Sequence, residues 1–450
     1  MVNNQNIVVL GVFLTIIFWL GGYSVYAAMC FPLMLVFLMV FIRNLSVAIP
    51  FRELAMVVAT LQLLASSFLA FYIQDPDAIF KPKGSPEAYF KFAVPGVLLF
   101  GLGLFLFKPR QRPDSDFFQR LSGYDLASIG KRFVYIGWAA FVLSPFMPGA
   151  ISYFVTLLVF LSYTGGIILL FSKLDRSQKG LWIGFAFLPV VRDALFAGIF
   201  FLAMIWIAYL TLYFLFRAQK GIVTNALIII LGIYFVVVID TAKKDYRSIT
   251  GERGRNLGIV DKGILFGSLF LDNASFNILS DESNLSGRVT RSNQGALVTW
   301  VMVHTPANQA FGEGGTVKDA ILAAIFPRFL MPNKAKAGGK DNFEKYTGHK
   351  LNQSTSMNIS LLGEGWANFG YWGGLIFMFC VGTFYSYVYR SFTGIMQKYP
   401  IYFFFIPFVF LYVIKAEDDL LTPLNHIFKA LMVLFALHHL VIKKIEPVDA

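Results

Sequence analysis

Long apolar runs are the feature of this 450-residue sequence that most restricts its fold. A helix that crosses a bilayer needs about 20 apolar residues, and in lipid every backbone polar group must find its hydrogen bond within the protein. Unbroken apolar runs therefore favour helices over a closed barrel. We predict an all-α polytopic integral membrane protein with about 12 transmembrane helices. The twelve apolar segments lie at about residues 6–20, 23–42, 53–73, 91–107, 133–148, 150–171, 180–192, 193–216, 221–240, 366–389, 400–415 and 427–442.

Composition agrees with this prediction, because only 14% of the residues are charged, against about 25% in soluble domains. The seventh segment is the exception among the twelve. With about 13 residues before Arg192, it is too short to span comfortably and is expected to be tilted, re-entrant or broken.

The orientation follows from the lysines and arginines of the short loops. Most of them fall on one side of the predicted spans, and the loops opposite contain Lys81, Lys83 and Arg192. Because cytoplasmic loops are enriched in positive charge, both termini are predicted to lie inside. The formal charge of +12 is explained by this orientation and by anionic lipid, so we expect no nucleic-acid partner.

The chain thus divides into three regions. Residues 1–240 form an N-terminal helix bundle, residues 241–365 one large extracytoplasmic loop with short helices, and residues 366–450 the C-terminal helices. We call residues 241–365 the outer segment. A connection of about 125 residues is usually functional or disordered. Apolar stretches within it argue against disorder, and we expect them to cap the bundle, to lie on the outer leaflet, or both.

Several kinds of site are not indicated by the sequence. Cys30 and Cys380 both lie in apolar runs, without the spacing of a disulfide framework or a metal site. No P-loop or dinucleotide-binding fingerprint is present, and no cofactor is predicted.

A polar segment between residues 325 and 374 carries the most informative motifs. It contains Phe326-Pro-Arg-Phe-Leu-Met-Pro-Asn-Lys334, then a tract rich in Ser, Thr and Asn, then Gly363-Glu-Gly-Trp-Ala-Asn368-Phe-Gly370 before an apolar run. Together these resemble the motifs of bacterial Wzy-type O-antigen polymerases, which are related to the O-antigen ligases. The resemblance in motif covers about fifty residues, while length, span number and the single large outer loop agree across the rest.

This resemblance implies a GT-C-like, metal-independent glycosyltransferase of the bacterial inner membrane. Such an enzyme would join undecaprenyl-diphosphate-linked oligosaccharide units into a surface polysaccharide at the periplasmic face. Membrane lipids and a chain-length regulator protein would be its other partners. The alternatives are a ligase that moves glycan onto another acceptor and, in a different class, a flippase for lipid-linked sugars.

A lipid diphosphate leaving group calls for arginines and lysines in an apolar setting, because their charge is then poorly screened. Arg192 interrupts an apolar run, which suits a functional cation or, equally, a side chain that reaches the head groups. We expect these cations to converge on one site. The predicted diphosphate ligands are Arg192, Arg288, Arg291, Arg328 and Lys334.

The acceptor sugar hydroxyl calls for a general base. Glu364 and His349 are the first candidates, with Arg328 as a further catalytic residue. Glu364 could instead stabilise the N-terminus of the following helix.

Asn368, Trp366 and His304 are assigned to acceptor binding, although a membrane-surface aromatic belt explains Trp366 as well. The acidic run 417–419 would bind sugar or anchor its loop in water. The spacing from Gly370 to Gly374 favours close helix packing.

Overall fold

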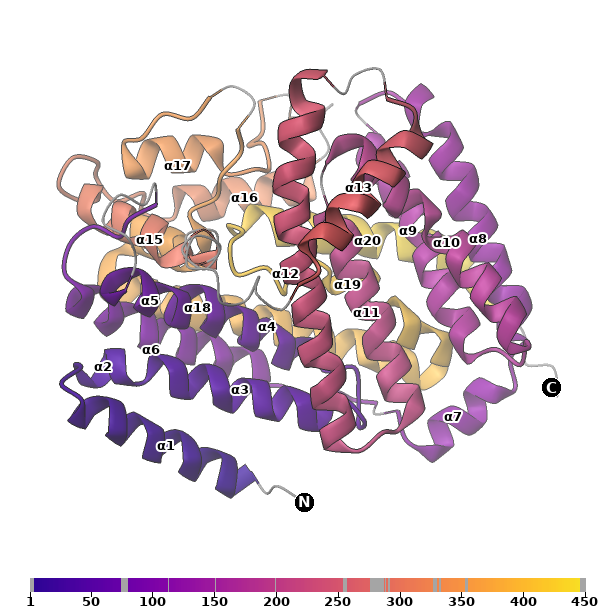
Figure 1. The fold of residues 1–450 in the computed structure, drawn as a ribbon, viewed down its shortest axis with the longest axis horizontal. Coiled ribbons are helices and arrows are strands. Elements are labelled where there is room, and N and C mark those ends of the chain that lie inside the picture. The colour runs from indigo at the N-terminus through magenta and orange to yellow at the C-terminus, as the bar shows by residue number, and fades with distance from the viewer. Residues whose placement is uncertain are drawn as a thin grey trace.

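The computed structural model describes residues 4–73, 80–111, 113–149, 151–198, 200–253, 257–275, 287, 289, 292–326, 330–331, 333–352 and 355–445. In these residues the regular structure is entirely helical, as predicted (Figure 1). The helices up to the long outer segment are α1 (Asn4–Leu20), α2 (Val25–Ala28), α3 (Cys30–Asn44), α4 (Phe51–Thr60), η1 (Leu61–Ala65), α5 (Ser66–Tyr72), α6 (Pro86–Phe105), α7 (Ser115–Ser122), α8 (Leu126–Leu143), η2 (Ser144–Phe146), α9 (Ser152–Phe171), α10 (Arg176–Ala197), α11 (Phe201–Ala218) and α12 (Ile222–Arg253).

The remaining helices include four short ones from the outer segment. They are α13 (Ile259–Asn273), α15 (Gln294–His304), α16 (Gly315–Ile325), α17 (Lys340–Thr347), α18 (Ser360–Lys398), η5 (Pro400–Phe405), α19 (Ile406–Phe410), α20 (Leu421–Leu440) and η6 (Ile442–Lys444).

Each of the twelve predicted apolar segments falls on helix. Within the described residues, nine helices are long and apolar enough to cross a membrane, which makes this a multi-pass membrane protein. The other three segments correspond to α1 and η5–α19, which are shorter, and to α10, which carries four charged residues.

The bounds predicted for the seventh segment are wrong. Residues 180–192 are not a short or broken span, because α10 continues through Arg192 and Asp193 as a regular helix of 22 residues. The helix ends at Gly198, whose φ of 62° is left-handed. Arg192 and Asp193 are tolerated inside it because both point outward and pair with each other.

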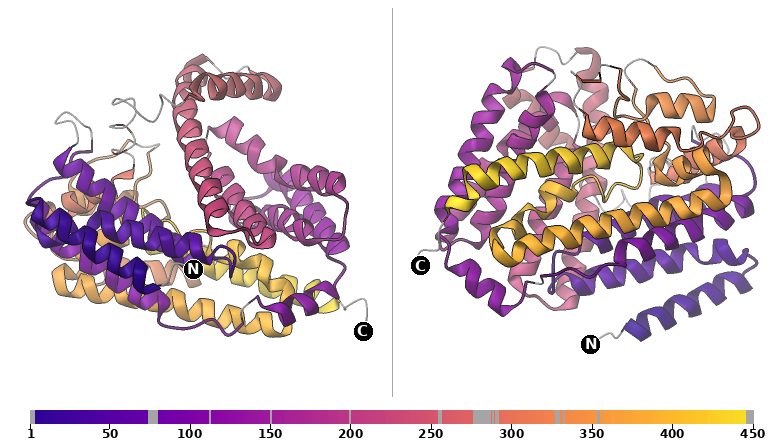
Figure 2. Two further views of the ribbon diagram at one scale, coloured as in Figure 1. Left: turned by 60° about the horizontal axis from the view of Figure 1, so that its bottom comes forward. Right: turned by 180° about the vertical axis from the view of Figure 1, so that it is seen from behind.

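Close glycine contacts hold α18 against α6, and Figure 2 shows the two helices side by side. A Cβ atom at Gly103 would lie 2.3 Å from the Phe379 carbonyl oxygen, and one at Gly382 would lie 2.2 Å from that of Phe100. Small residues thus let the two backbones meet, as expected for helix packing in lipid.

Helix α18 is broken at Gly370, whose φ of 64° and ψ of −155° are not helical. We call residues 360–369 its short arm and residues 371–398 its long arm. In a straight helix, residues nine apart are separated by about 13 Å along the axis. Here Cα of Gly374 comes within 3.3 Å of the Cβ position of Gly365, so the arms fold against each other. Gly374 therefore packs closely, as predicted, whereas Gly370 makes the break.

The loop before α16 compensates for this break. Carbonyls just before an interruption lose their regular helical donors. The Gly312 N–H donates to the Ala367 carbonyl (2.9 Å) and the Glu313 N–H to that of Asn368 (3.0 Å). The broken helix and the outer segment thus form one hydrogen-bonded unit.

The start of α1, helix α7 and the end of α20 lie toward one end of the molecule, away from α15 and α17 (Figures 1 and 2). The predicted boundary at residue 240 lies within continuous helix, because α12 extends to Arg253.

Candidate functional site

Glu364 is the best-placed candidate, in the short arm of α18 with 1% of its surface exposed. Its Oε1 accepts a hydrogen bond from Thr316 Oγ1 (2.5 Å) and its Oε2 accepts one from the Leu420 N–H (2.7 Å). Thr316 lies in the first turn of α16, and Leu420 is the N-cap of α20. The carboxylate therefore meets the positive ends of two helix dipoles, which stabilise negative charge.

Asn368 lies one turn after Glu364 and joins the same network. Its Nδ2 donates to Thr316 Oγ1 (2.8 Å) and to the Glu364 carbonyl (2.8 Å). Its Oδ1 is buried and has no partner in the described part of the chain. Thr316 thus links Glu364 to Asn368, which leaves one acceptor available beside the carboxylate.

Asp418 and Asp419 are buried next to this network, at 2% and 1% exposure. Asp418 Oδ1 accepts from Asn358 Nδ2 (2.9 Å), and Asp419 Oδ2 accepts from Asn342 Nδ2 (3.3 Å). Anchoring of this loop in water is therefore wrong, because both carboxyl groups lie inside the protein. We call Glu364, Asp418 and Asp419 the carboxylate cluster.

The burial of these aspartates affects their protonation. Burial, only partly offset by the Lys415 ammonium, raises the pKa of Asp418 to about 6. Burial likewise raises the pKa of Asp419 above its ordinary value. Asp418 is thus able to take up a proton at mildly acidic pH.

Lys415 balances part of this negative charge. Its Nζ lies 2.9 Å from Glu417 Oε1 and 3.1 Å from Asp418 Oδ1, and 4.5 Å from the centre of the Phe201 ring. Burial lowers the pKa of Lys415, but the carboxylates of Asp418 and Glu417 outweigh it and raise the pKa overall. Lys415 therefore stays charged.

The long arm of α18 adds the Tyr385 hydroxyl, which is buried with no partner among the described residues. Tyr385 interacts electrostatically with all three members of the carboxylate cluster. A cavity of about 20 Å³ bordered by Lys415 and Leu361 has room for about one water molecule. In the described residues, no group of three or more His, Cys, Asp or Glu side chains is arranged to hold a metal ion.

His349 does not join this cluster. Its Nδ1 lies 2.9 Å from the Thr347 carbonyl and so must carry the hydrogen, while Nε2 lies 3.2 Å from Lys83 Nζ, which can only donate. The ring also stacks on Trp300, with centroids 4.5 Å apart. Both ring nitrogens are thus occupied, which leaves none free to accept a proton from substrate.

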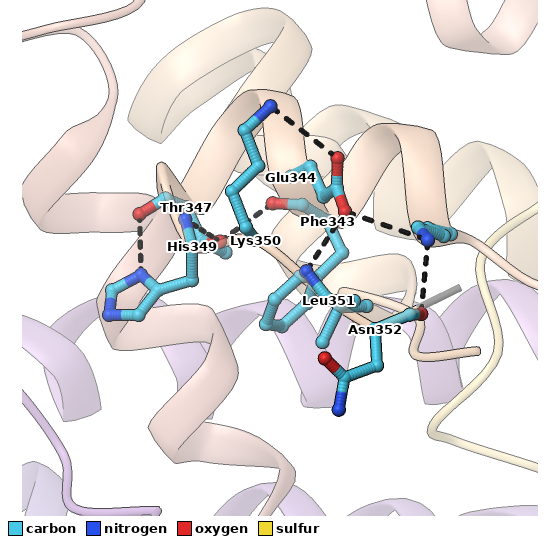
Figure 3. Close-up of polar contacts among 8 residues, drawn as sticks. Phe343, Glu344, Thr347, His349, Lys350, Leu351 and Asn352 are labelled. Atoms are coloured by element: carbon cyan, nitrogen blue, oxygen red, sulfur yellow. Dashed lines mark hydrogen bonds and ion pairs between the residues drawn. The ribbon is translucent and has the colours of Figure 1, made fainter. Parts of the chain in front are cut away.

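Glu344 ties the segment around His349 to α17 (Figure 3). Its carboxylate accepts a hydrogen bond from the Leu351 N–H (2.9 Å) and lies 3.7 Å from Lys350 Nζ. The Leu351 N–H is the main reason why the pKa of Glu344 is lowered. In Figure 3 the His349 ring points away from this carboxylate toward the other side of the turn.

Trp366 and His304, which were assigned to the acceptor, make structural contacts. Trp366 Nε1 donates to the Thr305 carbonyl (2.9 Å), and its ring packs edge-on against Phe92. His304 packs against Gly348, where a Cβ would lie 2.6 Å from its ring.

Among the predicted cations, Lys334 Nζ donates to the Ala323 and Phe326 carbonyls (2.7 and 2.8 Å) and so caps α16. Arg192 is half-exposed and pairs with Asp193 at 2.9 Å. Its guanidinium lies over the rings of Phe196 and Phe141, which belong to α10 and α8. Arg192 therefore contacts α8 and α10, whereas Lys334 contacts α16. Arg288, Arg291 and Arg328 lie outside the described residues.

Of the predicted site residues, Glu364 and Asn368 thus come together around Thr316. Sequence reasoning missed Thr316 and Tyr385, whose surroundings in the sequence carry no distinguishing signal. Asp418 and Asp419 were visible as an acidic run between apolar segments. Comparison with family models, curated proteins and solved structures gives no match to this chain.

Proposed function

We propose that the protein is a glycosyltransferase that polymerises undecaprenyl-diphosphate-linked oligosaccharide units at the periplasmic face of the bacterial inner membrane. The support is the motif resemblance of residues 326–374. The observation that carries the proposal is the burial of Glu364, from within that segment, beside two further carboxyl groups.

The reaction forms a bond between an acceptor hydroxyl oxygen and the anomeric carbon of the donor glycan. The bond between that carbon and the lipid diphosphate breaks, and undecaprenyl diphosphate leaves with the bonding electrons. The acceptor hydroxyl loses one proton, which a carboxylate can take up. Glu364 is the proposed base, and Asn368 Oδ1 is an acceptor able to orient the hydroxyl.

The leaving diphosphate needs cations at the outer membrane surface. Arg328, which lies outside the described residues, is the cation we test, because it belongs to the motif 326–334 that carries the resemblance. The cavity bordered by Lys415 has a volume of about 20 Å³ and is too small for a sugar. A ligase acting on a different acceptor would use the same chemistry.

A transporter for lipid-linked sugars is a second candidate, favoured by one observation. Broken helices near charged groups are typical of transporter binding sites, and α18 is broken at Gly370 six residues after Glu364. A transporter would move lipid-linked units across the membrane without lengthening them.

Purified protein in detergent, given lipid-linked repeat units and no nucleotide sugar, tests the proposal. We expect a ladder of longer glycans, and we expect Arg328→Ala to abolish it at unchanged expression. Lys318→Ala, on the exposed side of α16, is the matched control and should leave the ladder intact. Absence of lengthening by the folded wild-type protein would refute polymerase activity, and an unchanged ladder from Arg328→Ala would remove Arg328 from the site.

A further inference from the structure

The outer segment contains a helix, α13, that the carboxylate cluster does not use. It crosses α12 where the apolar part of that helix ends. From Ile222 the sequence of α12 is almost entirely apolar until Asp240, which pairs with Lys243 at 2.6 Å. These first charges mark the membrane surface on α12.

Three contacts fix α13 at this level. In the apolar part of α12, Phe235 stacks on Phe270 of α13, with ring centroids 6.0 Å apart. In the part of α12 that follows Asp240, Tyr246 packs against Phe266, and Asp245 Oδ2 accepts a hydrogen bond from Asn273 Nδ2 (3.2 Å). The helix therefore lies across the boundary between the apolar and the charged parts of α12.

The faces of α13 differ sharply. Leu265, Phe266 and Leu269 pack against the protein core. At about 100° per residue, Val260, Ile264 and Leu271 fall on the opposite face. They are 69%, 66% and 73% exposed.

A third, narrower strip of α13 is polar. Asp261, Ser268 and Asp272 form it, and all three are exposed. An exposed apolar face bordered by a polar strip is the pattern of a helix that lies in a membrane interface.

A comparison with α15 shows that the exposed apolar face is specific to α13. The two helices come from similar apolar stretches of the outer segment, yet residues 294–301 of α15 are all buried, whereas no residue of α13 is. The exposed apolar surface of α12 meets α13 at Phe235, which is 42% exposed and stacks on Phe270.

Two cations lie on the protein-facing side of α13, where it meets α10. Lys262 Nζ of α13 and Arg192 Cζ of α10 lie 4.7 and 4.5 Å from the centre of the same Phe196 ring. Asp193 neutralises Arg192 in part, so the pair keeps a net positive charge. Positive charge at the membrane surface complements lipid phosphate.

We propose that α13 is docked in the outer leaflet of the bilayer. Val260, Ile264 and Leu271 enter the acyl region, Asp261, Ser268 and Asp272 face water, and Lys262 and Arg192 bind glycerophospholipid phosphate. The inference is independent of the proposed glycosyltransferase activity.

Spin labels test the position of the helix. Full-length protein with Cys30→Ala and Cys380→Ala receives single labelled cysteines at 260, 264, 268, 271 and 272, in vesicles of phosphatidylethanolamine and phosphatidylglycerol. A label at Leu227 on α12 gives the reference accessibility for lipid. A label at Lys350, whose side chain is 89% exposed, gives the reference for water. We expect oxygen to collide more often than a water-soluble nickel complex at 260, 264 and 271, and the reverse at 268 and 272.

Two outcomes would overturn docking in lipid. Equal access of the nickel complex to Ile264 and Ser268 would place α13 in water. Exclusion of both reagents at Ile264 would show that a second protein surface covers it.

The cations are tested with spin-labelled phosphatidylglycerol and the double variant Lys262→Ala, Arg192→Ala. Removal of each cation should weaken association with this lipid about fivefold. The matched control is the double variant Lys345→Ala, Lys350→Ala, which removes one lysine of α17 and one that follows this helix. It should leave the association with this lipid unchanged. Equal association in both double variants would refute the phosphate contact.

Discussion

At the scale of single residues, Glu364 joins three helices through one carboxylate. Glu364→Ala would leave the Leu420 N–H and the Thr316 hydroxyl unpaired inside the protein. Burying such groups without partners costs about 2–4 kcal/mol. We therefore expect a clear drop in Tm, measured by thermal unfolding in detergent. Glu313→Ala, which removes an exposed carboxylate, is the control and should leave Tm almost unchanged.

This experiment also separates the two predicted roles of Glu364. Lower stability of Glu364→Ala supports the helix-anchoring role. Unchanged stability with loss of glycan elongation would contradict it and leave only the role of general base.

Asp418 gives a prediction on pH. In the unfolded chain its carboxyl group loses its proton near 3.8, whereas burial in the folded protein raises its pKa to about 6. Between these values the folded state binds more protons, so stability falls as pH rises and the loss is complete above about 6. The contribution of this one group is on the order of 3 kcal/mol.

The corresponding measurement is Tm of wild type and Asp418→Asn from pH 4 to pH 7. Because Asn does not titrate, the variant should lose part of the decline between pH 4 and pH 6. Curves with identical slopes would show that Asp418 titrates alike in the folded and unfolded states.

At the scale of single helices, the break in α18 depends on Gly370. Its φ of 64° with ψ of −155° is a backbone conformation for glycine, and a Cβ atom would lie 3.2 Å from the Phe311 ring. We expect Gly370→Ala to cost about 1–3 kcal/mol and to lower Tm, because alanine is strained there. Gly184→Ala in α10 is the control, since its helical site is open and alanine is the better helix former. Equal Tm values for the two variants would contradict the break.

Most helices were predictable from the sequence, because runs such as residues 150–171 and 221–240 contain no alternative to an apolar helix. The prediction failed at α10, where Arg192 was taken to end a segment. A local sequence window does not show that the side chains of Arg192 and Asp193 pair with each other on the exposed surface of α10. The break at Gly370 was also missed, because the loop 312–313 that satisfies its carbonyls lies more than fifty residues away in the chain.

At the scale of the whole molecule, the candidate site was only partly predictable. Glu364 stood out as a carboxylate at the start of an apolar run, but its partners come from α16 and α20, and pairing across helices leaves no trace in a single sequence. Arg192 contacts α8 and α10, and its predicted convergence with the other cations stays a prediction. Arg328, Arg288 and Arg291 remain predictions.

The proposed glycosyltransferase must form each glycosidic bond by breaking one bond to lipid diphosphate. The most direct measurement is the amount of undecaprenyl diphosphate released per repeat unit joined, with purified protein and defined lipid-linked units. We predict one molecule released for each bond formed, and no release with Arg328→Ala. Lipid-linked units that are moved across vesicle membranes with neither release nor lengthening would contradict the account and identify a transporter.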